Sequence, residues 1–194
     1  MQQLTRTDLM PLEVYADARA AWRAQVIQHK KHRKVSIGAH ATLYFEDRTT
    51  IQYQIQEMLR AERIFERDAI QQELDAYNPL IPDGTNLKAT FMLEYTDPDL
   101  RKVELARLIA VEDRVWLRVA GHDKIYAIAD EDMARENAHK TSSVHFLRFE
   151  FDGDMIAALK SGAALAAGID HENCRDSVDP LPQAVRSALL ADLD

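Results

Sequence analysis

The sequence lacks the features that identify several common protein classes. Its 194 residues contain one cysteine, Cys174, which excludes a disulfide within the chain and a zinc knuckle built on paired thiolates. No apolar run approaches the roughly 18 residues that span a bilayer, and no signal-peptide pattern begins the chain. We therefore expect a cytoplasmic protein without a membrane segment. The GxxxxGK[ST], GxGxxG, GxSxG and HExxH motifs are also missing, so no motif names a reaction.

The composition is that of an ordinary globular protein, with 46% hydrophobic and 29% charged residues. The length and the lack of a linker predict a single domain over residues 1–194. The net charge of −8 is unevenly divided, because residues 1–34 carry +4 and residues 35–194 carry −12. Such an acidic body repels phosphate backbones and anionic lipids, so we expect no nucleic-acid or membrane partner.

Hydrophobic periodicity predicts both helices and strands, with the longest helices in the first half of the chain. Helices are expected from residue 8 or 11 to the basic run 29–34, over 50–65 with a continuation to 77, and over 98–110, 154–167 and 182–193. Strands are expected over 35–46 with a break at Gly38, 87–95 and 144–151, and a hairpin over 115–129. The order favours an α+β fold, in which long N-terminal helices pack on an antiparallel sheet with additional C-terminal helices.

Polar residues interrupt two of the predicted apolar faces. A helical wheel places Glu62 in the same sector as Ile51 and Ile55, and strand alternation places His145 beside Leu147. A buried carboxylate or imidazole needs a partner, and Glu62 is one candidate partner for His145. A further cluster, Asp170-His171-Glu172 with Cys174, follows a predicted helix that ends at Gly168.

Three hypotheses can explain these polar residues. In the first, neighbouring groups satisfy Glu62 and His145, and both residues are structural. In the second, Glu62, His145 and His171 bind a divalent metal, iron or manganese, which such a donor set suits. In the third, Glu62 or His145 is a general acid or base in a cofactor or substrate pocket. The polar residues beside the apolar stripe of the second helix would line that pocket or surround the metal ligands: Arg48, Gln52, Gln56 and Arg60.

Several segments resemble a known family. The segment FEDRTTIQYQIQEMLRAERI at residues 45–64 resembles the signature of an uncharacterised bacterial family known only as a domain of unknown function. Further similar segments are LDAYN at 74–78, LIP at 80–82, VHFLRF at 144–149, GIDH at 168–171 and LLADL at 189–193. The resemblance implies genes encoded beside rubrerythrin-type diiron proteins and iron–sulfur oxidoreductases, and therefore partners of those types. It also implies an accessory role in a redox or peroxide-handling pathway.

The leading hypothesis is therefore a cytoplasmic accessory protein of a redox pathway that binds a metal or a cofactor. A second hypothesis is a non-catalytic interaction module or homodimer, in which the first helix and the glutamine-rich ridge form a docking face. A third is a small-molecule enzyme that uses Glu62 as a general base.

Overall fold

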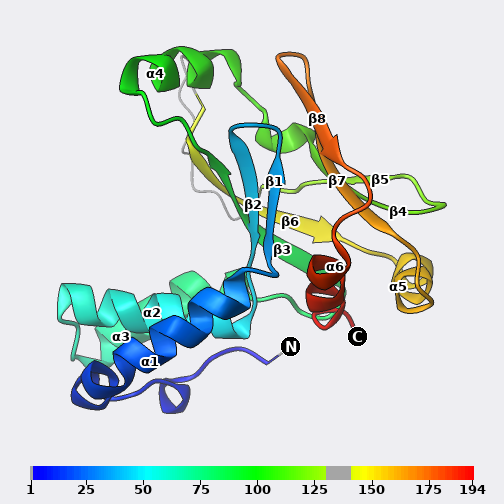
Figure 1. Ribbon diagram of the computed structural model, residues 1–194. Coiled ribbons are helices and arrows are strands. Elements are labelled where there is room, and N and C mark those ends of the chain that lie inside the picture. The colour runs from blue at the N-terminus through cyan, green and yellow to red at the C-terminus, as the bar shows by residue number, and fades with distance from the viewer. Residues whose placement is uncertain (1, 130–140) are drawn as a thin grey trace.

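The computed structural model describes residues 2–129 and 141–194 and confirms the α+β class. This part of the chain forms six α-helices and two four-stranded antiparallel sheets. Three helices gather at one side of the molecule, and the sheets, with the other helices around them, make up the rest (Figure 1).

The first three helices form a unit with its own small core, which we call the helical unit. It consists of α1 (Leu12–Lys30), α2 (Arg48–Glu62) and α3 (Arg67–Tyr77), with short 3-10 turns at Arg6–Asp8 and Asn78–Leu80. Asp47 caps α2 by accepting a hydrogen bond from the Thr50 amide. One cluster of buried apolar side chains in this unit contains Leu4, Ile51, Ile55, Leu59, Leu74, Leu80 and Ile81, and α1 also buries Tyr15 and Val26.

The first sheet, sheet A, has the strand order β1-β2-β3-β6. Its strands are β1 (Lys34–Ile37), β2 (Ala41–Phe45), β3 (Asn86–Leu93) and β6 (Val144–Glu150). Gly38, with φ of 64°, allows the tight turn between β1 and β2, at the break that the sequence predicted. Alternate residues of each strand point to a buried inner face, and the residues between them form an outer face that the helical unit partly covers.

The second sheet, sheet B, has the order β5-β4-β7-β8, with strands β4 (Val115–Val119), β5 (Lys124–Tyr126), β7 (Leu165–His171) and β8 (Cys174–Val178). The inner faces of both sheets contribute to one large apolar core, which includes Leu43, Phe91, Leu117 and Ile169. Side chains from three further helices join this core: α4 (Pro98–Arg107), α5 (Gly153–Lys160) and α6 (Gln183–Leu190).

The predicted helix over 154–167 is only half correct. Helix α5 ends at Lys160, and Gly162, with φ of 107°, turns the chain out of the helix. The following alanine-rich segment is strand β7, because it pairs with β4 and β8 in the centre of sheet B. Gly168 is therefore no helix stop: it lies opposite Trp116, whose ring occupies the place of a side chain at residue 168.

A buried ion-pair cluster joins the helical unit to the sheets. Arg33 lies between α1 and β1 and donates two hydrogen bonds of 2.7 Å to the carboxylate of Asp192, just after α6. Its Nε also lies 2.9 Å from Asp47 Oδ2, and His29 Nε2 lies 2.6 Å from the same oxygen. We call Arg33, Asp47 and Asp192 the junction cluster, because it fixes the start of α2 against the edge of the sheets.

Candidate functional site

Glu62 is not a buried carboxylate. It is the last residue of α2, and its side chain is exposed, as are those of Ala61 and Phe65 in the same predicted sector. The helical wheel predicted the correct direction around the axis, since Ile51, Ile55 and Leu59 are buried. A helical wheel contains no information on position along the helix axis. Glu62 is exposed because the last turn of α2 extends beyond the core of the helical unit.

His145 is a core histidine, as strand alternation predicted, and its side chain is 2% exposed. Its Nε2 lies 3.0 Å from Thr141 Oγ1 and 3.0 Å from the Ser142 carbonyl oxygen. The carboxylate that faces it, at 3.7 Å, belongs to Glu112. The suggestion that Glu62 partners His145 is therefore wrong, because Glu112 occupies that position.

His171 lies at the end of β7, and both of its ring nitrogens contact the backbone. Nε2 donates to the Ile109 carbonyl oxygen at 3.0 Å, while Nδ1 accepts from the Asn173 amide at 3.2 Å. This pair of bonds fixes the neutral tautomer that carries its proton on Nε2. The imidazole is thus already satisfied by its surroundings.

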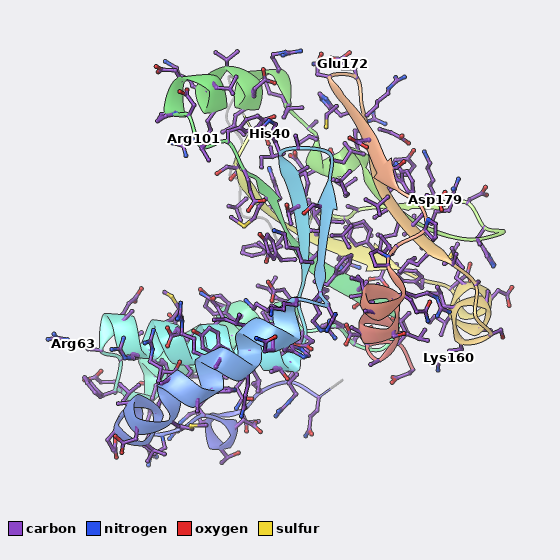
Figure 2. All side chains as sticks on the ribbon, viewed as in Figure 1. His40, Arg63, Arg101, Lys160, Glu172 and Asp179 are labelled. Carbon is purple, nitrogen blue, oxygen red and sulfur yellow. The ribbon has the colours of Figure 1, made fainter. Side chains whose placement is uncertain are left out.

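The structure does not bring the three predicted metal ligands together. In Figure 2, Arg63 beside Glu62 and Glu172 beside His171 lie at opposite ends of the molecule. Within residues 2–129 and 141–194, no group of three or more His, Cys, Asp and Glu side chains could hold a metal ion.

The polar ridge of α2 binds the N-terminal segment of the chain. Gln56 donates to the Met10 carbonyl oxygen and accepts from the Met10 amide, both at 3.0 Å. Gln52 donates to the Asp8 carbonyl oxygen, and Arg48 forms an ion pair of 2.6 Å with the Asp8 carboxylate. Gln52, Gln56 and Arg48 therefore hold the N-terminal segment against α2. Arg60, the fourth residue predicted to bind a cofactor, is exposed.

A groove of about 370 Å³ lies where the helical unit meets the outer face of sheet A. Its apolar lining comes from α2, the 3-10 turn after α3, and strands β3 and β6: Ile51, Leu80, Met92, Val144 and Phe146. Its polar lining comes from α1, α2, α3, β2, β3 and the residue after β2: Lys30, Tyr44, Glu46, Gln54, Tyr77 and Thr90. A mixed lining and a volume of this order are typical of small-molecule sites.

Two charges of opposite sign line this groove. The carboxylate of Glu46 accepts hydrogen bonds from the hydroxyl of Thr50, at 2.5 Å, and from that of Thr90, at 2.7 Å. Lys30 is the last residue of α1. Among the described residues, neither Glu46 nor Lys30 forms an ion pair. Both charges can therefore meet a ligand without breaking an existing ion pair.

A second hollow of about 370 Å³, on the outer face of sheet B, has a different character. Four of its charged side chains form two ion pairs, since Lys124 lies 2.5 Å from Asp170 and Arg118 lies 2.5 Å from Asp179, and its other two, Arg175 and Asp176, are exposed. Lys124 stands over the ring of Trp116, which is only 4% exposed. The Lys124 ammonium, then the Tyr126 hydroxyl, lower the pKa of Asp170.

Little in the sequence pointed to the groove. Glu46 and Gln54 lie inside the segment that carries the family resemblance, but the helical wheel drew attention to their neighbours, which bind the N-terminal segment instead. Strand alternation over 87–95 did separate Thr90 and Met92 from the buried positions. The contribution of Lys30 and Tyr77 depends on how the helices dock on the sheet, which no local pattern reports.

Comparisons with known proteins identify the family without a function. The chain belongs to the family described as protein of unknown function (DUF3501), which it matches over residues 3–193. It is similar to a crystal structure of a protein of unknown function from Burkholderia pseudomallei, with 53% identity, a TM-score of 0.94 and complete coverage of both chains. No curated protein matches. In the part of the chain that the structure describes, no helix has the length and apolar character needed to cross a membrane.

Proposed function

We propose that this member of the DUF3501 family is a non-catalytic binding protein that holds a small amphipathic molecule in the groove between the helical unit and sheet A. The observation that carries this proposal is the combination of an apolar floor with two charges, Glu46 and Lys30, that have no ion-pair partner among the described residues. An apolar body would contact Phe146 and Met92, while polar groups of the molecule would meet the charges of Glu46 and Lys30.

The other hypotheses have less support from the geometry. Metal binding by Glu62, His145 and His171 would require large movements, because these residues lie on separate parts of the fold. A general base at Glu62 would stand on an exposed helix end rather than in the groove. We retain the redox or peroxide-handling setting, which the family resemblance suggests, and the cytoplasmic location, which is expected from the sequence, as part of the proposal.

A binding test with a filled groove examines the proposal directly. Met92 lies half-buried in the groove, so Met92→Trp adds bulk where a ligand would sit. The probes are four phenyl compounds that differ in charge: 2-phenylethanol, 2-phenylethylamine, 3-phenylpropionate and L-phenylalanine. We expect calorimetry to detect binding of at least one compound to the unmodified protein, and at least about tenfold weaker binding to Met92→Trp.

A tryptophan on the same sheet face, but outside the groove, provides the control. Ser36 on β1 is exposed and lies opposite Thr42 on the outer face of sheet A. Ser36→Trp should bind the probes as the unmodified protein does. Equal binding by Met92→Trp and the unmodified protein, or no binding of any of the four compounds, would overturn the proposal.

A further inference from the structure

The two groove charges belong to different elements. Glu46 lies between β2 and α2, whereas Lys30 ends α1, so the fold brings two residues that are separated in the sequence to one groove. They form an ion pair neither with each other nor with another described side chain. The groove therefore presents an anion and a cation at the same time, and a ligand that complements both must carry both signs of charge.

The carboxylate is held in place but retains capacity for a ligand. The Thr50 and Thr90 hydroxyls each donate to a different oxygen of Glu46, which fixes the carboxylate plane. An ionised carboxylate offers about four acceptor positions, so these two bonds leave room for an ammonium group. Hydrogen bonds between charged groups are shorter and stronger than neutral ones, which makes an ammonium the best complement to this oxygen pair.

The apolar lining of the groove indicates the chemistry of the rest of the ligand. Phe146, Met92 and Ile51 can cover a large aromatic or aliphatic side chain, and the volume of about 370 Å³ admits one. We infer that the groove recognises an amino-acid zwitterion with a large apolar side chain, its ammonium at Glu46 and its carboxylate at Lys30. This inference rests on the proposed function and adds the chemical class of the ligand.

The four phenyl compounds test the contribution of each charge to binding separately. L-Phenylalanine carries both charges, 2-phenylethylamine only the ammonium, 3-phenylpropionate only the carboxylate, and 2-phenylethanol neither. We expect calorimetry to give a dissociation constant for L-phenylalanine at least about tenfold lower than for either singly charged compound. Glycyl-phenylalanine, added as a fifth compound, distinguishes a free amino acid from the end of a short peptide.

Two substitutions assign each charge to its residue. In Glu46→Gln, L-phenylalanine should bind no more tightly than 3-phenylpropionate. In Lys30→Met, it should bind no more tightly than 2-phenylethylamine. Each lost difference in affinity is the advantage that the removed charge gave to L-phenylalanine. Lys31→Met, in the exposed residue after α1, and Glu94→Gln, which replaces a carboxylate on the outer face of sheet A beyond the groove lining, are matched controls that should leave both advantages intact.

The outcomes distinguish this inference from the proposed function. If all four phenyl compounds bind equally well, and Met92→Trp weakens them together, the groove binds small molecules but the zwitterion assignment is overturned. The zwitterion assignment is also overturned if Glu46→Gln and Lys30→Met leave the order of affinities unchanged. If no compound binds, both proposals fail.

Discussion

The outer faces of the two sheets carry hollows of the same volume, about 370 Å³, with opposite chemistry. On sheet B, two ion pairs, Lys124–Asp170 and Arg118–Asp179, occupy the hollow beside a buried tryptophan, and the remaining charged side chains are exposed. On sheet A, the helical unit closes one side of a groove whose two charges have no such pair among the described residues. The comparison shows that the size of a hollow does not identify a site. Charges left without an ion pair beside apolar surface are the better indication, because a ligand gains from them without breaking internal contacts.

The largest expected effect concerns the junction cluster that sets the helical unit against the sheets. Among the described residues, Asp192→Ala leaves the buried guanidinium of Arg33 with Asp47 as its remaining ion-pair partner. Removing one member of a buried ion pair costs about 3–5 kcal/mol, and urea unfolding should show a loss of this size. Asp154→Ala, at an exposed position in α5, should stay within about 0.5 kcal/mol of the unmodified protein. An equal loss in both variants would contradict the role given to the cluster.

A smaller effect tests whether the outer face of sheet B is a packed structural surface. A methyl group at Gly168 would lie 2.2 Å from the Trp116 ring, so Gly168→Ala must displace the indole. Overpacking of this kind costs about 1–3 kcal/mol in the free energy of unfolding. Gly153→Ala is the matched control, because a methyl group there meets no atom within 4 Å. If the thermal unfolding of Gly168→Ala matches that of the control, the indole is loosely held and the comparison between the faces fails.

The smallest effect is the pH dependence of the Lys124–Asp170 pair. The folded-state pKa of Asp170 lies below its ordinary value of 3.8, so the pair stabilises the fold above that pH. This contribution is lost as the pH falls through the lowered pKa. Because both side chains are about one-third exposed, Asp170→Asn should cost only about 0.5–1 kcal/mol at pH 7. The difference between the variant and the unmodified protein should shrink in acid. A difference that grows in urea unfolding at low pH would contradict the assigned pair.

The sequence predicted the α+β class, the capped helix after Asp47 and the alternating strand around Phe91, because each rests on local periodicity. It failed at β7, where the alanine-rich segment favours a helix locally but pairing with β4 and β8 decides the outcome. For the candidate site, it indicated that His145 is buried but not that Glu62 is exposed. The groove could not be predicted, since its lining comes from segments between residues 30 and 146 that meet only after folding.

The measurement that tests the central claim most directly is a nitrogen–proton correlation NMR titration of the isotope-labelled protein with each of the four phenyl compounds in turn. We expect at least one compound to shift the amide signals of Ile51, Thr90 and Phe146 together, while the indole signal of Trp116 stays in place. Shifts confined to Trp116 and Arg118, or no saturable shift with any compound, would contradict the assignment of the groove as the binding site.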